Sequence, residues 1–161
     1  MKNKFGYYAF DFAPETYSLP EDTNLFLSRY NQIAQQLEIG GTPAERDFDD
    51  IQEGHVDNSW IIKPSQSSQG KGIYIIENSN EIPQDKNEKT VVCKYISNPL
   101  LINNHKFDLR IYVLVTCIDP LRIYIYNEGL VRFASEPYDT KGTKKNLYSH
   151  LTNYSINKKS E

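Results

Sequence analysis

The stretch Lys106-Phe-Asp-Leu-Arg-Ile-Tyr-Val-Leu-Val115 predicts a β-strand whose two faces differ in chemistry. Side chains alternate between the faces of a strand, and one face here is apolar: Phe107, Leu109, Ile111, Val113 and Val115. We expect this face in the core. The other face carries Lys106, Asp108, Arg110 and Tyr112. Charges on a central strand are tolerated when they are paired or bind a ligand. Two interpretations stay open: a self-neutralised ladder, with Lys106 and Arg110 flanking Asp108, or a ligand site.

Short apolar runs on both sides of this stretch predict further strands, and they cover residues 60–64, 72–76, 91–96, 121–126 and 130–135. Short connections at 118–120 and at the Asn127-Glu-Gly129 turn predict an antiparallel meander. Residues 22–38 carry apolar side chains at helical spacing and predict an amphipathic helix. The expected fold class is α+β, with antiparallel sheets flanked by helices.

Bulk composition narrows the class of protein. The 161 residues include 18 Lys and Arg against 21 Asp and Glu, so the near-neutral charge argues against nucleic acid as a partner. No apolar run approaches a membrane span, so we expect no membrane partner and a cytoplasmic protein. Cys93 and Cys117 lie in apolar runs without CxxC spacing, which favours buried free thiols. Residues 40–58 are acidic and rich in turn residues, and we expect an acidic surface loop there.

The segment Ser65-Gln-Ser-Ser-Gln-Gly-Lys71 separates two predicted strands, and Lys63 lies at the end of the first. Glycine permits close approach of backbone N–H groups to phosphate, hydroxyls donate hydrogen bonds, and lysines add positive charge. A phosphate-binding hairpin is therefore one interpretation, and an ordinary solvated turn is the other. The spacing does not match a Walker A loop, and the loop leads into a strand rather than a helix.

Seven blocks in order closely resemble the tubulin–tyrosine ligase-like family, and especially its polyglutamylase branch. They are Trp60-Ile-Ile-Lys-Pro, Ser68-Gln-Gly-Lys-Gly-Ile, Tyr95-Ile-Ser-Asn-Pro-Leu-Leu-Ile, Lys106-Phe-Asp-Leu-Arg-Ile-Tyr-Val-Leu-Val-Thr, Pro120-Leu-Arg-Ile-Tyr, Glu128-Gly-Leu-Val-Arg-Phe-Ala and His150-Leu-Thr-Asn-Tyr-Ser-Ile-Asn-Lys. The resemblance implies an ATP-grasp fold, with residues 1–161 forming part of one such domain that is incomplete at its C-terminal end.

The resemblance also implies roles for single residues. Those expected to bind ATP are Lys63, Gln69 and Gly70 at the phosphates, Cys93, Lys94, Tyr95 and Ile96 at the adenine, Lys106 and Asp108 on the strand, and Thr152 and Asn153 at the phosphate and metal end. Arg132 is expected to bind the carboxylate of the incoming amino acid, with Tyr154 or Ser155 nearby. The expected catalytic residues are Arg132 and Lys106. Taken alone, Arg132 is better explained as an exposed strand arginine beside Glu128.

Two positions depart from the family pattern, and one motif of the family is not found in this sequence. Cys93 stands where the hinge usually begins with glutamine, and Gln69 stands where many members have arginine. The family's magnesium ligands include a later Glu-x-Asn motif, so we expect no metal ligand in this chain and ligands beyond Glu161. The chain therefore resembles an N-terminal and central fragment of a ligase.

The function that the resemblance implies is an ATP-dependent ligase that adds glutamate to glutamate side chains of tubulin tails through an acylphosphate, with ATP and Mg²⁺ as cofactors. Its expected partners are tubulin or microtubules and free glutamate, and its expected location is cytoplasmic, at microtubules, cilia or basal bodies. Three alternatives stay open: a glycine-adding ligase of the same family, a nucleotide-binding but inactive fragment or pseudoenzyme, and an ATP-grasp ligase that joins small metabolites.

Overall fold

A computed structural model of the chain describes residues 12–39, 57–66, 71–83, 85, 87–140 and 144–160. The chain divides into two compact units, Met1–Asn98 and Pro99–Glu161. The predicted α+β class is confirmed, because both units contain helices and antiparallel strands. The predicted surface loop lies outside the described residues up to position 56, and so do Gln69 and Gly70.

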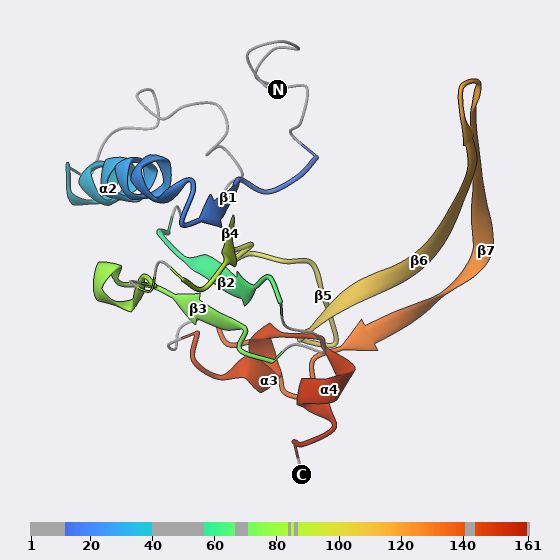
Figure 1. The fold of residues 1–161 in the computed structure, drawn as a ribbon. Helices are drawn as coiled ribbons and strands as arrows, with labels where there is room; N and C mark the ends of the chain where they lie inside the picture. Colours follow the sequence, from blue (N-terminus) through green and yellow to red (C-terminus); the bar gives the residue numbers. More distant parts are fainter. Residues whose placement is uncertain are drawn as a thin grey trace. The chain divides into compact units, whose positions relative to one another are not determined.

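The first unit contains a four-stranded antiparallel sheet (Figure 1). Its strand order is β1 (Thr16–Leu19), β4 (Thr90–Lys94), β2 (Trp60–Pro64) and β3 (Tyr74–Ile76), and a short 3₁₀ helix, η4 (Ser79–Glu81), follows β3. The predicted hairpin is confirmed, since β2 and β3 pair with Ile61 opposite Ile75. The predicted run at 91–96 ends earlier, at Lys94.

Helix α2 (Thr23–Ile39) covers one face of this sheet, as the periodicity of residues 22–38 predicts. Thr23 begins the helix, and its Oγ1 donates to the Pro20 carbonyl at 2.8 Å. Phe26 and Ile33 of the helix are buried against Trp60 and Ile62 of the sheet. The Phe26 and Trp60 rings meet edge to face with centroids 5.1 Å apart, a favourable geometry for aromatic pairs.

The second unit is built on a three-stranded sheet in the order β5 (Leu101–Ile102), β6 (His105–Ile118), β7 (Leu121–Phe133). Asn103 and Asn104 connect β5 to β6 with φ of 50° and 63°. Asparagine tolerates this left-handed region better than most residues, so the pair suits a two-residue hairpin turn. Two short helices, α3 (Leu147–His150) and α4 (Tyr154–Asn157), follow.

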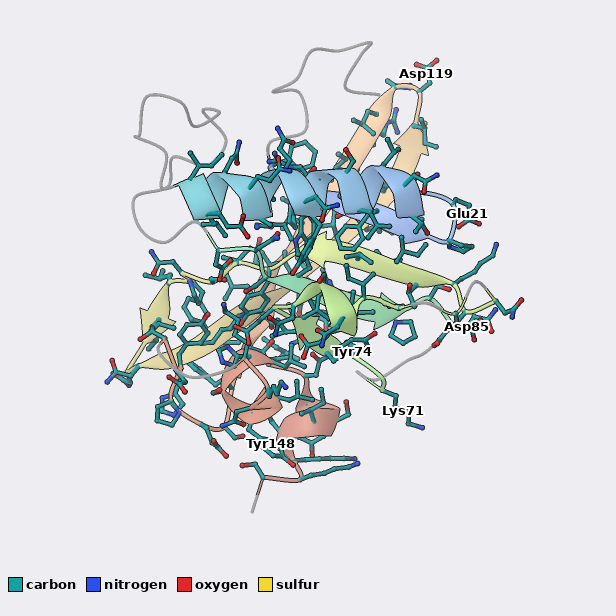
Figure 2. The ribbon with its side chains drawn as sticks, turned by 90° about the vertical axis from the view of Figure 1, so that its left-hand side faces the viewer. Glu21, Lys71, Tyr74, Asp85, Asp119 and Tyr148 are labelled. Carbon is teal, nitrogen blue, oxygen red and sulfur yellow. The ribbon has the colours of Figure 1, made fainter. Side chains whose placement is uncertain are left out.

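The expectation that the apolar face of β6 is buried is wrong over most of its length. Phe107 is half-buried, but Leu109, Ile111, Val113 and Val115 are 51–59 % exposed. Among the described strands, β6 pairs beyond the short β5 only with β7, and the two form a long hairpin with Asp119 at its tip (Figures 1 and 2). No described element covers either face of its outer part, because almost every residue from 109 to 131 is exposed.

The expected turn at Asn127-Glu-Gly129 is also wrong, since these residues lie inside β7. Ile111 pairs with Gly129 and Val113 with Ile125, so three residues of β7 stand opposite Tyr112 in a bulge. A Cβ at Gly129 would lie 2.6 Å from the Arg110 carbonyl oxygen. Glycine is therefore needed at position 129 for close approach of the strands rather than for a turn. The predicted meander is instead a two-stranded hairpin of β6 and β7.

Candidate functional site

The polar face of β6 is neutralised across the sheet by an arginine of β7. Asp108 lies directly opposite Arg132 in the strand register. Arg132 Nε donates to Asp108 Oδ1 at 2.7 Å, and Nη2 donates to Oδ2 at 2.7 Å. The side chains are 37 % and 36 % exposed. This is a bidentate pair, in which both partners have one defined orientation.

Thr152, in the loop between α3 and α4, completes this cluster. Its Oγ1 donates to Asp108 Oδ2 at 2.6 Å. Burial of Asp108 favours the neutral acid, but hydrogen bonds from Arg132 and Thr152, and the charges of Arg132 and Arg110, outweigh it and hold the pKa below its usual range. The hydrogen bond to Asp108 raises the pKa of Arg132. The pair is therefore fully ionised at neutral pH.

The segment that carries Thr152 is held by Asn157, a residue that the sequence analysis did not single out. Asn157 Oδ1 accepts hydrogen bonds from the backbone N and the Oγ of Ser135, both at 2.8 Å. Its Nδ2 donates to the carbonyls of Leu151 at 2.8 Å and Asn153 at 3.0 Å. One amide thus ties the end of β7 to both sides of Thr152. Sequence offered little signal, because an asparagine in a polar block is usually a turn residue.

Lys106 lies two positions before Asp108, on the same face of β6. Its Nζ is 5.9 Å from the centroid of the Tyr138 ring, within reach of a cation–π interaction. Tyr138 is buried and packs edge to face on His150, with ring centroids 4.9 Å apart. Tyr138 is a second residue that sequence analysis missed, and its ring lies near the Lys106 ammonium.

The structure brings together three of the predicted site residues: Asp108, Arg132 and Thr152. Asn153 occupies the N-cap position of α4 without a side-chain capping hydrogen bond, Tyr154 and Ser155 begin the helix, and Tyr154 is 74 % exposed. The sequence left open a self-neutralised charge ladder within β6 and an exposed Arg132 beside Glu128. Both of these interpretations have to be modified. Asp108 is neutralised by Arg132 of the neighbouring strand rather than only within its own strand, and Arg132 pairs with Asp108 rather than with Glu128.

In the first unit, Lys63 and Cys93 lie on the face of the sheet opposite helix α2. Lys63 is exposed, and it alternates with Ile62, which packs in the core under α2. Cys93 pairs with Ile61, the neighbour of Ile62, and its sulfur accepts a hydrogen bond from Thr16 Oγ1 at 3.5 Å. Both cysteines are free, Cys93 buried and Cys117 half-buried. Lys63 and Cys93 therefore share one face of the sheet.

The predicted adenine hinge is fixed by hydrogen bonds within the first unit. The N–H of Lys94 donates to the Glu15 carbonyl at 2.8 Å, and the N–H of Tyr95 donates to the Ser59 carbonyl at 3.0 Å. Lys94 Nζ points to the other face, where it donates to the Asp57 carbonyl at 2.5 Å and lies over the Trp60 ring. Ile96 is 57 % exposed, and within the described ranges its N–H has no hydrogen-bond partner.

Asp57 contacts this hinge at Lys94 and the chain directly after it at Ser97. Its Oδ2 accepts from Ser97 Oγ at 2.6 Å and from Ser59 Oγ at 3.0 Å. Asp57 belongs to the stretch that we expected to be a surface loop, where an aspartate among several carries no distinguishing signal. The hinge is therefore held between β2 and the segment after β4.

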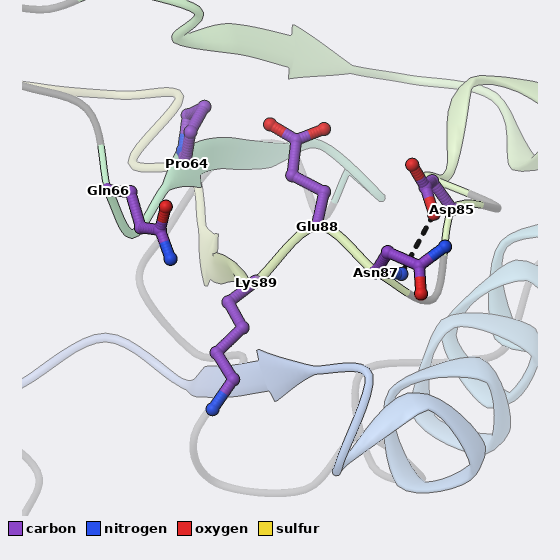
Figure 3. Close-up of a pocket in the computed structure, with 6 residues that line it drawn as sticks. All are labelled: Pro64, Gln66, Asp85, Asn87, Glu88 and Lys89. Carbon is purple, nitrogen blue, oxygen red and sulfur yellow. Dashed lines mark hydrogen bonds between the residues drawn. The ribbon is translucent and has the colours of Figure 1, made fainter.

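A pocket of about 340 Å³ opens beside the end of β2 (Figure 3). It is lined by Pro64, Gln66, Asp85, Asn87, Glu88 and Lys89. The backbone N–H of Asn87 donates to Asp85 Oδ1 at 2.8 Å, and Lys89 forms an ion pair with Glu21 at 3.6 Å. None of the predicted site residues lines this pocket. Its two carboxylates make it a poor site for phosphate.

Magnesium does not fit the residues that the structure describes. No group of three His, Cys, Asp or Glu side chains lies together in them. The carboxylate of Asp108 already accepts three hydrogen bonds, one of which comes from a cation, so it is unsuited to be a metal ligand. That ligands lie beyond Glu161 stays a prediction. Among the helices described, none is both long and apolar enough to span a membrane.

Comparison with known proteins places the whole chain in one family. The family model described as "Tubulin-tyrosine ligase family" matches residues 1–161. Human "Tubulin polyglutamylase TTLL5" is 43 % identical over 162 residues, which cover 99 % of this chain and 11 % of that protein. "Tubulin polyglutamylase ttll-5" of Caenorhabditis elegans is 42 % identical over 154 residues, 94 % of this chain and 20 % of that protein. The mouse protein "Tubulin monoglutamylase TTLL4" is 38 % identical over 160 residues, 99 % of this chain and 11 % of that protein.

The chain belongs to the tubulin-tyrosine ligase family. It spans between about a tenth and a fifth of the length of these relatives. The resemblance seen in the sequence blocks is therefore confirmed, including its likeness to the glutamylases of the family.

Proposed function

We propose that this chain supplies nucleotide- and carboxylate-binding parts of an ATP-dependent ligase that adds glutamate to glutamate side chains on tubulin tails. The observation that carries the proposal is the fixed guanidinium of Arg132, oriented by Asp108 beside Thr152. An arginine fork recognises a free carboxylate by two parallel hydrogen bonds, a geometry that lysine lacks. The relatives named as glutamylases support glutamate as the amino acid.

The proposed reaction has two steps. The acceptor carboxylate takes the terminal phosphoryl group of ATP and becomes an acylphosphate, with ADP as the leaving group. The amine of the incoming glutamate then attacks the acyl carbon, a C–N bond forms, and phosphate leaves as the C–O bond breaks. Positive charge must compensate the transferred phosphoryl group. Lys63 and Lys106 are the residues of this chain that we assign to the phosphates and the nucleotide.

Adenine recognition is assigned to the exposed end of the hinge. The N–H groups of Lys94 and Tyr95 are already used within the unit. The N–H of Ile96 is the hinge donor that could meet an adenine nitrogen, while Cys93 contributes an apolar contact. A backbone contact of this kind does not depend on which side chain begins the hinge, so cysteine in place of glutamine is compatible with ATP binding.

The proposed partners are tubulin or microtubules, and the proposed location is the cytoplasm, at microtubules, cilia or basal bodies. The assignment of tubulin rests on the names of relatives such as human "Tubulin polyglutamylase TTLL5", and the location rests on the family resemblance of the sequence blocks.

The test is ATP-dependent incorporation of labelled glutamate or glycine into tubulin tail peptides by the full-length protein. We expect incorporation of glutamate, and its loss in Arg132→Ala. Arg122→Ala is the matched control, since Arg122 is an exposed arginine near the far end of the same strand. Full activity in Arg132→Ala would overturn the carboxylate assignment. Preference for glycine, or nucleotide binding without incorporation, would support the corresponding alternative instead.

A further inference from the structure

The predicted adenine hinge leaves the sheet of the first unit just before its exposed end. Strand β4 ends at Lys94, which lies opposite Trp60 of β2 in the register. Ile96 lies two positions further on, outside the strand, and is 57 % exposed. The strand ladder therefore does not fix the backbone at Ile96, although this residue carries the N–H that we assign to adenine.

Two hydrogen bonds hold the residues that flank Ile96. The N–H of Tyr95 donates to the Ser59 carbonyl at 3.0 Å. The Oγ of Ser97 donates to Asp57 Oδ2 at 2.6 Å, although these two residues are 40 positions apart in the chain. Both acceptors belong to the short segment that leads into β2, so this segment holds the chain before and after Ile96.

Asp57 brings several donors of this region together. Besides Ser97, its carboxylate accepts from the N–H of Ser59 at 3.3 Å and from the Oγ of Ser59 at 3.0 Å. Its carbonyl accepts from Lys94 Nζ at 2.5 Å. An ionised carboxylate has about four acceptor positions and suits three converging donors. An amide at this position would have one acceptor oxygen and an NH₂ group that cannot accept.

We infer that Asp57 is a positioning residue for nucleotide recognition, which holds Ser97 directly and Tyr95 through Ser59, and so fixes the Ile96 N–H before ATP arrives. The inference rests on the proposed function and deepens it. Asp57 itself is given no contact with ATP. The sequence blocks that resemble the family begin at Trp60, so the resemblance assigns no role to Asp57.

Fixing the hinge matters because the proposed contact with the base is a single backbone hydrogen bond. Such bonds weaken steeply when the donor is misaligned, and a segment that is already ordered loses less freedom on binding. The phosphates are assigned to other residues, among them Lys63. Lys63 lies opposite Val91 within the ladder of β2 and β4. A change at Asp57 should therefore weaken recognition of the base and spare that of the phosphates.

A local turn is the simpler role for Asp57. Aspartate often accepts from the backbone N–H two residues on, and its bond from the N–H of Ser59 has this form. A turn does not explain the bond from Ser97, which comes from a distant part of the chain. Ser97→Ala distinguishes the two roles, because it leaves the local turn intact and removes the bond to the hinge.

The experiment measures the Kd of the full-length protein for ATP and for inorganic triphosphate, which has phosphates but no base. Asp57→Asn should raise the ATP Kd roughly 10-fold, the scale of one hydrogen bond to a charged group, and leave the triphosphate Kd within about twofold of the wild type. Ser97→Ala should raise the ATP Kd by about 3- to 10-fold. Ser97→Thr keeps the hydroxyl and should restore the wild-type value. Asp85→Asn is the matched control, an exposed aspartate in another loop of the same unit, and should change neither Kd.

Hydrogen exchange at the Ile96 amide gives a second readout. It should be fast in the free protein and slowed by ATP but not by triphosphate, and Asp57→Asn should reduce the slowing at equal ATP concentration. No slowing by ATP in a wild type that binds it would overturn the inference.

The binding data have separate outcomes for the inference and for the proposed function. An ATP Kd in Ser97→Ala equal to that of the wild type would overturn the inference and leave the proposed ligase standing. So would equal weakening of ATP and triphosphate binding by this variant, because the effect would not be specific to the base. If Asp57→Asn does not fold, Ser97→Ala and Ser97→Thr decide the question. A wild-type protein that binds no ATP would remove the proposed function, and this inference with it.

Discussion

Asp108 of β6 and Arg132 of β7 form a bidentate ion pair across the sheet, with both N···O distances at 2.7 Å. The two residues are 24 positions apart in the chain, and the long hairpin makes them direct neighbours. Thr152 adds a third hydrogen bond from outside the sheet.

Arg132→Met should raise the pKa of Asp108. Burial of Asp108 favours the neutral acid, and the hydrogen bonds and charge of Arg132 oppose this effect. Without Arg132, the effect of burial on the pKa of Asp108 is opposed less strongly. Because the folded-state pKa lies below the unfolded one, the pair stabilises the wild type above the usual range of aspartate, and this contribution is lost as the pH falls through the lowered pKa. A ¹³C NMR titration of the Asp108 carboxyl measures the pKa directly.

Arg122→Met is the control for this titration, because Arg122 lies opposite Cys117 at the far end of the hairpin. It should leave the pKa of Asp108 unchanged. An Asp108 pKa in Arg132→Met as low as that of the wild type would show that the ion pair does not form in solution.

Sequence alone could predict the elements whose apolar side chains follow a helical or strand pattern. Phe26, Tyr30 and Ile33 mark the helix face, and the apolar runs mark β2, β3 and β4. The alternation in β6 showed which side chains could be buried, but not that the outer part of the hairpin has no covering element. The role of Gly129 was ambiguous, because glycine serves both turns and close strand contacts.

The candidate site, too, could be predicted from the sequence only in part. Family resemblance named Asp108, Arg132 and Thr152, but not the hydrogen bonds among them. Which residue of β7 meets Asp108 depends on the register, and the bulge opposite Tyr112 shifts that register in a way that periodicity does not show. Asn157 and Asp57 were missed because their roles depend on contacts with distant backbone and side-chain groups.

Thr90→Val should stabilise the protein. Thr90 is 3 % exposed, and its Oγ1 has no hydrogen-bond partner in the part of the chain that the structure describes. A buried hydroxyl without a partner costs about 1–3 kcal/mol, and valine keeps the branched shape that suits a strand. We expect the free energy of unfolding to rise by about 1 kcal/mol in urea titrations.

Thr23→Val is the matched comparison for Thr90→Val, because the Thr23 hydroxyl donates to the Pro20 carbonyl at 2.8 Å. It should lower stability by about 1 kcal/mol. If both substitutions lowered stability equally, the Thr90 hydroxyl would have a hydrogen-bond partner in solution.

Phe26→Ala should strongly destabilise the first unit. Phe26 is fully buried and packs edge to face on Trp60. Truncation of a buried phenylalanine typically costs about 3–5 kcal/mol through lost contacts and the cavity that remains. Thermal unfolding followed by tryptophan fluorescence suits the measurement, since Trp60 is the single tryptophan of the chain. Leu25→Ala, at a neighbouring position that is 64 % exposed, should change stability by less than about 0.5 kcal/mol.

Gly129→Ala should distort the hairpin. The added Cβ would lie 2.6 Å from the Arg110 carbonyl oxygen, a backbone atom that cannot rotate away. We expect a loss of about 1–3 kcal/mol, typical of overpacking, and faster hydrogen exchange at the amides of β6 and β7. Glu128→Ala, at the adjacent exposed position, should leave exchange in the hairpin close to that of the wild type. Equal protection in both variants would contradict the close strand approach.

The outer part of the β6–β7 hairpin should promote self-association and contribute little to the stability of the chain. Val115 and Ile123 are cross-strand neighbours, each 51 % exposed, in an apolar face of the kind that promotes association. The double substitution Val115→Thr and Ile123→Thr should reduce self-association in sedimentation experiments and leave the free energy of unfolding within about 0.5 kcal/mol of the wild type.

The matched buried pair is Val92 and Ile62, cross-strand neighbours that are both 0 % exposed. The same double substitution there should cost several kcal/mol or prevent folding, because it buries two hydroxyls in an apolar core. An equal loss of stability from the two double variants would mean that the hairpin face is covered in solution.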